Sequence, residues 1–310
     1  MRRSYLCLGS FLRAYSKKIS TKTKPMVSFI IPAFNEGDQL ALNIYNLIQQ
    51  YSELPFSASA EFLLATDSVN ASTFNSMDWL NQNGLCKSYV LTERIGKGGT
   101  IKNLVQISKG KVIVILDADV PVSVDKIHNA IMKIAEEKAD IVIAQRKERS
   151  DGELRKFLSV SYNLLVKILF NSNFRDHQAG FKVINAKALS QALKFIRTDS
   201  LAFDTELLVW AKKSGLKILA ADVDWEENRK EHTSNVLPAR SVLTMLIDLL
   251  VLRVLSIDGN SDRMLQRIPV GNILDTEGKE VSQEYMTVLT SKHKKLGLFR
   301  RLYLALAFRA

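Results

Sequence analysis

The chain has 310 residues, 46% of them hydrophobic and 24% charged, which is enough to bury the core of one large globular domain. Its net charge of +11 lies at the ends, because residues 1–25 carry seven Lys or Arg, residues 291–310 carry six, and neither segment contains an acid. The remaining residues together carry about −2, which argues against a nucleic-acid groove across the domain. Two cysteines, Cys7 and Cys86, provide neither a disulfide framework nor metal-ligand spacing, and they favour a reducing compartment.

Residues 1–25 form a basic, Ser-rich extension ahead of the first predicted strand. This composition is typical both of an amphipathic anchor on a membrane surface and of an organelle presequence, and the segment could also precede a start at Met26. Its apolar run is too short for a transmembrane span. We expect the two basic ends to contact an anionic surface, with freely solvated tails as the alternative.

The first half of the chain alternates apolar runs typical of strands with amphipathic stretches typical of helices. Strands are predicted at residues 27–31, 61–66, 87–91, 112–116 and 140–145, and helices at 38–50, 72–82, 101–108 and 124–138. Short connections between them are typical of a parallel sheet that is covered by helices on both faces. We therefore predict an α/β fold whose sheet is mostly parallel.

The central predicted strand ends in two aspartates. Its residues 112–116 are all β-branched or aliphatic, as in a strand that is buried on both faces. Asp117 and Asp119 follow where that strand leaves the sheet, which is where parallel sheets bind ligands. Two unpaired carboxylates would repel each other, whereas a divalent cation such as Mg²⁺ that bridges to a phosphate removes the repulsion. The alternative is a turn with two solvated aspartates.

Two further loops suit an anionic ligand. Residues 32–37 (PAFNEG) join the first strand to the N-terminus of a helix. Residues 93–100 (ERIGKGGT) place three glycines around Lys97 in a flexible loop just before a helix, so that amides and an ammonium group can meet phosphate oxygens. The second loop lacks the spacing of a P-loop, and an ordinary glycine turn is its alternative.

The second half of the chain has a different pattern. It predicts a helix at 154–170, a polar loop at 176–182 that enters a short strand, helices at 186–195 and from 203, and a strand at 216–223. Asp204 is a candidate N-cap of its helix. His177, in the polar loop, is a candidate acid–base group.

The C-terminal residues 236–310 are amphipathic and basic. Charges interrupt the apolar residues 236–257, so this stretch is predicted to be an amphipathic helix in a bilayer interface and not a transmembrane span. A helix packed on the domain is the alternative. Residues 256–284 are turn-rich, and residues 292–309 are a second candidate for an interfacial helix.

Eight short motifs occur in order along residues 27–250. They are SFIIPAFNE (28–36), LLATDS (63–68), RIGKGG (94–99), DADV (117–120), AQR (144–146), DHQAGFK (176–182), FDTELL (203–208) and VDWEE (223–227). Together they resemble the inverting glycosyltransferases of family 2, which have the GT-A fold with its Rossmann-like sheet. Within that family the chain is similar to the dolichyl-phosphate (polyprenyl-phosphate) hexosyltransferases, and the sixth and seventh motifs favour the glucosyl over the mannosyl synthases.

The resemblance implies three regions: an extension at 1–25, a GT-A glycosyltransferase domain at 26–235 and a membrane-associating region with amphipathic helices at 236–310. Two departures from the family pattern weaken parts of it. The second strand ends in Thr66-Asp67-Ser68-Val69, where relatives commonly have an Asp-Asp-Gly-Ser-like turn. Val120-Pro121 follows the two aspartates, where some relatives have a further polar metal ligand.

The resemblance also implies a role for particular residues. The nucleotide base and ribose would be held by Ala33, Glu36 and Asp67, and the donor would lie against Lys97. Mg²⁺ or Mn²⁺ on the donor diphosphate would be held by Asp117 and Asp119. The acceptor phosphate would be received by Arg146 and Arg155, and the sugar and acceptor pocket would be shaped by Asp176, Gly180 and Glu206. The residues expected nearest the chemistry are Asp119, Arg146 and Asp176.

The implied reaction is the metal-dependent, inverting transfer of a hexose from a nucleotide sugar to dolichyl or polyprenyl phosphate at a membrane surface. UDP-glucose is the favoured donor and GDP-mannose is the alternative. A metal ion would neutralise the leaving diphosphate, and a lipid phosphate that is already anionic needs no general base. We expect a peripheral enzyme on the cytoplasmic face of a membrane, without a transmembrane helix. The alternatives are a soluble glycosyltransferase with a small acceptor and, in a different class, a nucleotidyltransferase.

Overall fold

The computed structural model describes residues 26–54, 59–67, 70–146, 153–172, 174–223, 245–250, 252–253, 265–275 and 279–289. The strands are β1 (Val27–Ala33), β2 (Ala60–Thr66), β3 (Lys87–Leu91), β4 (Val112–Leu116), β5 (Ile141–Arg146), β6 (Phe181–Asn185), β7 (Ile218–Val223), β8 (Leu265–Asp275) and β9 (Glu280–Leu289). The helices are α2 (Gln39–Glu53), α3 (Ala71–Gln82), α4 (Gly96–Ile107), α5 (Val124–Ala135), α6 (Glu153–Phe170), α7 (Ala186–Leu193) and α8 (Phe203–Lys213). The alternation of strands and helices predicted for the first half of the chain is confirmed.

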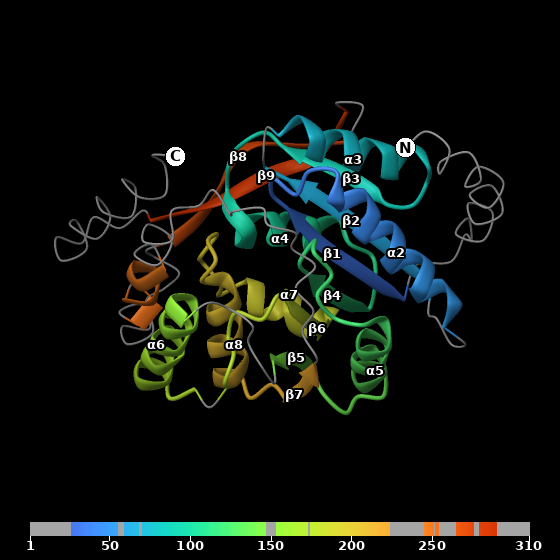
Figure 1. Ribbon diagram of the computed structural model, residues 1–310. Helices are drawn as coiled ribbons and strands as arrows, with labels where there is room; N and C mark the ends of the chain where they lie inside the picture. The colour runs from blue at the N-terminus through green and yellow to red at the C-terminus, as the bar shows by residue number, and fades with distance from the viewer. Residues whose placement is uncertain are drawn as a thin grey trace.

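The described strands form one sheet in the order β7-β5-β6-β4-β1-β2-β3-β8-β9 (Figure 1). β1 pairs with β2 and with β4 in parallel, and β2 pairs with β3 in parallel. β6 is antiparallel and lies between β4 and β5, so the fourth and fifth strands along the chain are not neighbours. The predicted α/β fold with a mostly parallel sheet is confirmed, and β6 brings the residues that precede it beside the end of β4.

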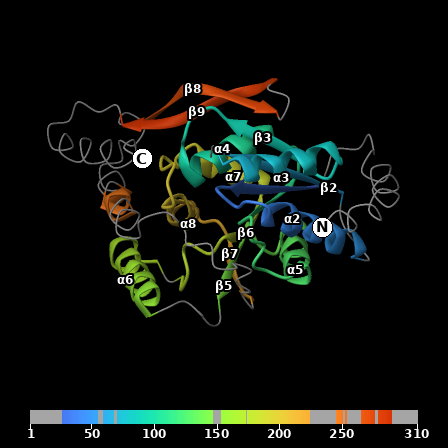
Figure 2. The same ribbon diagram turned by 45° about the horizontal axis from the view of Figure 1, so that its top comes forward.

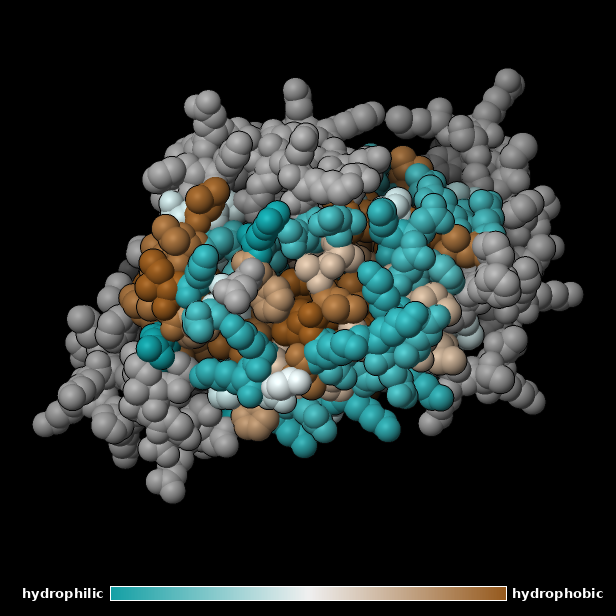
Figure 3. All heavy atoms as spheres, turned by 90° about the horizontal axis from the view of Figure 1, so that it is seen from below, coloured by the Kyte–Doolittle hydropathy of each residue, from teal (hydrophilic) through white to brown (hydrophobic). Residues whose placement is uncertain are grey.

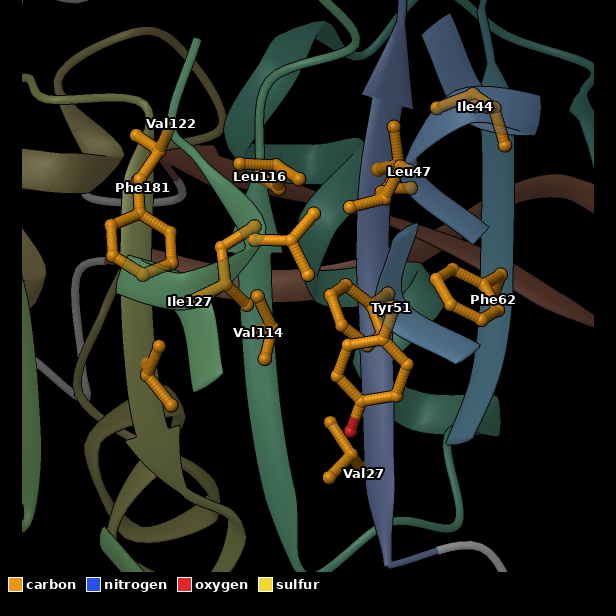
Figure 4. Packing of buried hydrophobic residues seen from close by; sticks show 14 of the residues in the cluster. Val27, Ile44, Leu47, Tyr51, Phe62, Val114, Leu116, Val122, Ile127 and Phe181 are labelled. Atoms are coloured by element: carbon orange, nitrogen blue, oxygen red, sulfur yellow. The ribbon is translucent and has the colours of Figure 1, made fainter. Parts of the chain in front are cut away.

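Side chains of the central strands alternate between two cores. Val112, Val114 and Leu116 of β4 point into a core that also includes residues of α2, α3 and α5. Ile113 and Ile115 point to the other face, into a core shared with α4, α7 and α8. Figure 4 shows part of the first core, with residues of β4 and α5 packed beside those of β1, β2 and α2. Helices therefore cover both faces of the sheet, as the unbroken apolar strand predicts.

The prediction that residues 256–284 are turn-rich is wrong for the described residues 265–275 and 280–284, which lie in strands. The strands β8 and β9 form an antiparallel hairpin, and β8 also pairs antiparallel with β3 (Figure 2). Ile273 of β8 is buried in the same core as residues of α4. The hairpin thus extends the sheet of the preceding domain, although sequence reasoning places residues 236–310 in a separate region.

Of the predicted amphipathic stretch 236–257, residues 245–250 and 252–253 are described, and they are helical. Met245 and Leu249 pack against Tyr162 and Val166 of α6, so this part follows the alternative of a helix packed on the domain. The candidate interfacial stretch 292–309 lies outside the described residues. Within the described part of the chain, no helix is both long enough and apolar enough to cross a membrane.

Candidate active site

Parallel pairing brings the ends of β1, β2 and β4 to one edge of the sheet. Ala33 is the last residue of β1, Asp67 follows β2 and Asp117 follows β4. Glu36, in the loop after β1, is half-buried at the same edge. The sequence therefore correctly places these predicted site residues at one end of the sheet, where α/β folds bind ligands.

The loops at this edge contain unusual backbone conformations. Asn35 has φ of 55° and Val120 has φ of 47°, both in the left-handed region. For a β-branched residue such as Val120 this conformation is strained, and strain of this kind tends to collect at functional sites. Val120 N donates to Asp117 O at 3.0 Å, and Asn43 Nδ2 of α2 donates to Ala118 O at 3.2 Å. These bonds fix the turn that carries the two aspartates.

Asp117 is held against the loop that precedes β6. Its backbone N donates to Gly180 O at 2.9 Å. A β-carbon built at Gly180 would lie only 1.7 Å from Asp117 Oδ2, so no other residue fits there without movement of the carboxylate or the backbone. Gly180, predicted to shape the sugar pocket, therefore lies in contact with a predicted metal ligand.

A chain of alternating charges extends from Asp117 into the protein. Lys97 Nζ lies 2.8 Å from Asp117 Oδ1 and 3.1 Å from Asp204 Oδ2. Lys182 Nζ lies 2.7 Å from Asp204 Oδ1 and donates to Ala179 O at 2.7 Å. Burial disfavours charge at Lys97, but Asp117 and Asp204 outweigh it and raise the Lys97 pKa. Burial likewise opposes charge at Asp204, yet Lys182 and Lys97 together hold its pKa below the usual range.

Sequence reasoning misses the observed roles of two of these four residues. The prediction makes Asp204 an N-cap, but the N-cap of α8 is Ala202, and the Asp204 carboxylate instead bridges two buried lysines. Lys182 is fully buried in β6, whereas the sequence identifies it only as part of a motif. An acid and a lysine that each lie within an apolar stretch are the sequence signal that could pair them, because isolated buried charges are costly.

The glycine-rich stretch also differs from its prediction. Gly96 to Gly99 form the first turn of α4 and not a flexible loop ahead of it. Asp67 Oδ2 accepts from Ile95 N at 3.1 Å and from Gly96 N at 2.7 Å, so a protein carboxylate occupies the anion position at this helix N-terminus. Burial raises the Asp67 pKa, although these hydrogen bonds act to lower it. Asp67, predicted to hold the base and ribose, therefore holds the first turn that carries Lys97.

The back of α4 rests on residues 199–200. Gly99 N donates to Asp199 O at 3.0 Å. A β-carbon at Gly98 would lie 2.6 Å from Phe203 Cβ and 2.9 Å from Ser200 O. Glu206, predicted to line the sugar pocket, is buried beneath this segment, where it accepts from Arg197 N, Thr198 N and Thr198 Oγ1. The described contacts of Glu206 therefore brace residues 197–198, and its contact with the sugar stays a prediction.

The loop that carries Asp176 and Gly180 is anchored through His177. Its ring lies 2.6 Å from Ser172 Oγ and 2.7 Å from Asn163 Oδ1 of α6, and it is fully buried. Burial lowers the His177 pKa to about 4, against the attraction of Asp176, so the ring is neutral at pH 7. The candidate acid–base role does not fit this position. His177 positions the loop, and Asp176 is buried beside it.

Two predicted acceptor-phosphate ligands are placed only by their backbone. Arg146 ends β5, where it pairs with Val223 of β7, and Arg155 lies in the first turns of α6. The positions of their side chains fall outside what the structure describes, so their roles remain predictions.

The residues at the end of β4 fit a divalent metal ion shared with a ligand. Asp117 is partly exposed, and Asp119 is 7% exposed two residues further on. No cluster of three or more His, Cys, Asp or Glu side chains suited to metal binding occurs in the described ranges. Two carboxylates completed by phosphate oxygens and water are a common Mg²⁺ donor set, so this chemistry matches a metal–diphosphate complex better than an all-protein metal site.

Comparisons with known proteins find relatives among glycosyltransferases. A glycosyltransferase, AglD, of Haloferax volcanii is 25% identical over 205 residues, which cover 64% of this chain and 33% of that protein. A dolichyl-phosphate beta-glucosyltransferase of Dictyostelium discoideum is 25% identical over 217 residues, which cover 65% of this chain and 66% of that protein. The chain thus matches about a third of the length of the first relative and just under two thirds of the second.

A solved structure shares the fold. Glucosyl-3-phosphoglycerate synthase of Mycobacterium tuberculosis, in complex with Mn²⁺, UDP-glucose and phosphoglyceric acid, has a TM-score of 0.57 and 13% identity, and the match covers 78% of this chain and 83% of that one. This likeness supports the GT-A fold expected from the motifs. The model of the family described as Glycosyl transferase family 2 matches residues 28–201, which are more than half of the chain. On these motifs, this sheet and this match, the chain belongs to glycosyl transferase family 2.

Proposed function

We propose that the protein transfers a hexose from a nucleotide sugar, UDP-glucose by preference, to the phosphate of a polyprenyl lipid such as dolichyl phosphate. The observation that carries this proposal is the placement of Asp117 at the end of β4, between Gly180 and Lys97. Relatives that are named dolichyl-phosphate beta-glucosyltransferases support the acceptor. UDP-glucose and Mn²⁺ in the solved structure of similar fold support the donor and the metal.

Asp117 and Asp119 would hold Mg²⁺ or Mn²⁺, which when bound supplies positive charge to the leaving diphosphate. Lys97 is the second cation at this position, and its ammonium group already lies against Asp117. Its raised pKa keeps it charged throughout the neutral range. Asp204, which is itself paired with Lys182, holds Lys97 from behind, so the cation is positioned before the donor arrives.

The chemistry is a single displacement. An oxygen of the acceptor phosphate forms the new bond to the anomeric carbon, the bond from that carbon to the diphosphate breaks, and its electron pair leaves with UDP. Because a phosphate monoester is already anionic at neutral pH, no protein base has to accept a proton. This fits a site whose one motif histidine is buried, neutral and bonded to Ser172 and Asn163.

The acceptor implies a location as well. A polyprenyl phosphate is held in a bilayer, so we propose a peripheral enzyme that works at the cytoplasmic face of a membrane. Arg146 and Arg155 are proposed to receive the acceptor phosphate. The region 26–235 is proposed to contain the donor site, with 1–25 and 236–310 contributing to membrane association.

The test is nucleotide release in the presence of Mg²⁺ or Mn²⁺, with UDP-glucose or GDP-mannose as donor, with and without dolichyl phosphate. Release of UDP that depends on the lipid supports the proposal. Release of GDP would keep the mechanism and change the donor. Equal turnover with a small phosphorylated acceptor would favour a soluble glycosyltransferase, and release of pyrophosphate would indicate a nucleotidyltransferase.

A further inference from the structure

One stripe of α6 is apolar and exposed. Val160, Leu164 and Ile168 are spaced four residues apart and so lie on one side of the helix, with 59%, 55% and 70% of their surface exposed. Leu250, on the neighbouring helical segment, is also exposed. Seen from below, hydrophobic residues gather on the left of the molecule, the side on which Figure 1 places α6 (Figure 3). A helix that only covers a soluble domain carries polar residues on this side.

The opposite side of α6 packs against the rest of the domain. Tyr162 and Val166 pack against Met245 and Leu249. The Tyr162 hydroxyl lies 2.8 Å from Thr205 Oγ1, and Asn163 accepts from His177 N at 3.2 Å. The apolar stripe is therefore not an incidental result of a loosely packed helix. It faces outward because the other side of α6 holds the loop that carries Gly180.

Basic residues accompany the stripe. Lys167 is exposed between Leu164 and Ile168, and Lys212 Nζ contacts the carbonyl oxygen of Asn171, just beyond the end of α6. Lys213, the next residue along the chain, is also exposed. Burial and, to a smaller extent, the charge of Arg253 lower the Lys213 pKa. Among the described side chains of α6, no exposed one is acidic.

We propose that the exposed side of α6, with Val160, Leu164, Ile168 and the cations at its C-terminal end, is a docking surface for an anionic lipid bilayer. An apolar stripe flanked by Lys and Arg is the pattern of a helix that lies in a bilayer interface, with its apolar side among the acyl chains and its cations at the headgroups. The proposal rests on the proposed lipid acceptor and adds the surface that meets the membrane. The same helix would then contact the bilayer on one side and the active-site loop on the other.

The experiment measures binding of the full-length protein to vesicles of phosphatidylcholine with about 30% phosphatidylserine, by co-sedimentation and without donor. The test variant is V160S/L164S/I168S. The matched control is L42S/M132S, which removes exposed apolar side chains from α2 and α5, outside the stripe. We expect the test variant to bind about tenfold more weakly or worse, and the control to bind like the wild type. Lys167→Gln, which removes one positive charge, should weaken binding about fivefold on these vesicles and little on pure phosphatidylcholine.

Equal vesicle binding by the test variant and the wild type would overturn the proposal, because the basic ends of the chain are present in both. The proposal would also be overturned if the wild type is a dimer, the variant is a monomer and both bind vesicles equally. The stripe would then contact a second copy of the chain. If the triple variant does not fold, Ile168→Glu replaces it, because that side chain is 70% exposed and makes few contacts to lose.

Glucosyl transfer to a short-chain prenyl phosphate in detergent separates this proposal from the proposed function. Transfer that persists in the triple variant while vesicle binding is lost supports both. If vesicle binding depends on the stripe but the wild type shows no transfer activity, the docking surface is supported. The proposed lipid acceptor is then contradicted.

Discussion

Gly180 lies so close to Asp117 that a β-carbon at position 180 would stand 1.7 Å from the Asp117 carboxylate. The glycine comes from the loop before β6, and the aspartate follows β4, the strand with which β6 pairs. A contact this tight couples the position of the carboxylate to the position of the loop. Any side chain at 180 must displace one of them.

Gly180→Ala is therefore expected to weaken Mn²⁺ binding by about tenfold or more, because a carboxylate that moves by an ångström no longer keeps its ligand geometry. Titration calorimetry with Mn²⁺ and UDP measures this directly. Gly84→Ala is the control, since Gly84 has φ of 66° and a β-carbon at that position would have no atom within 4 Å. It should lower stability by about 1 to 2 kcal/mol through backbone strain and leave Mn²⁺ affinity unchanged. Unchanged affinity in the Gly180 variant would contradict the proposed role of Asp117.

Asp204→Asn tests the buried charge chain. Removal of the carboxylate leaves Lys182 and Lys97 without their shared acid, and breaking a buried pair in this way costs about 3 to 5 kcal/mol of folding free energy. The double variant D204N/K182M should recover part of that loss, because it also removes one unpaired cation. Urea unfolding of the wild type, both single variants and the double variant gives the coupling energy. Additive losses would show that the two residues do not interact.

Glu206→Gln separates a bracing role from contact with the sugar. The carboxylate accepts from the amides of residues 197 and 198 and from the Thr198 hydroxyl, so its loss should lower stability by about 1 to 3 kcal/mol. The KM for the donor should change little, because these contacts account for both oxygens. A large rise in KM with unchanged stability would instead support the sugar contact predicted from sequence.

Asp248 makes stability depend on pH. It is buried on the helical segment 245–250 and accepts a hydrogen bond from Ser200. Burial, with a smaller contribution from the charges of Glu206 and Asp199, raises its pKa to about 7, although the hydrogen bond from Ser200 acts to lower it. Between about pH 4 and 7 the folded state keeps a proton that the unfolded state has released, so this group lowers stability as pH rises through that range.

Asp248→Asn removes this dependence. Its melting temperature should be close to that of the wild type near pH 4 and several degrees higher near pH 8. The comparison uses the difference between the two proteins at each pH, because buried His177 has the opposite effect: its lowered pKa makes the fold lose stability as pH falls. A difference that does not change with pH would mean that Asp248 is ionised in the folded protein at all these values.

Much of the fold could be predicted from local patterns. Residues 112–116 are apolar without alternation, and both faces of β4 are indeed buried. The hairpin of β8 and β9 could not be predicted, because β8 pairs with β3, which is far away along the chain, and because the hairpin sequence has no clear period of two. The insertion of β6 between β4 and β5 is likewise a choice of tertiary pairing that no local pattern records.

The candidate site also has a part that the sequence predicts and a part that it does not. Its acids at strand ends follow from position along the chain, so sequence reasoning places Asp67 and Asp117 at the correct edge of the sheet. Their partners do not follow, because the contact of Lys97 with Asp204 and that of Gly180 with Asp117 join residues that are distant in sequence. The order of the motifs indicates which residues belong to the candidate site, and the structure shows which of them are in contact.

The most direct test of the central claim is UDP release from UDP-glucose by the wild type and by Asp119→Ala, each with Mn²⁺ and with or without dolichyl phosphate. We predict release that depends on the lipid in the wild type and that falls by about a hundredfold or more in the variant, which lacks one of the two carboxylates proposed to hold the metal. Release that is independent of the lipid, or that is undiminished in Asp119→Ala, would contradict the account.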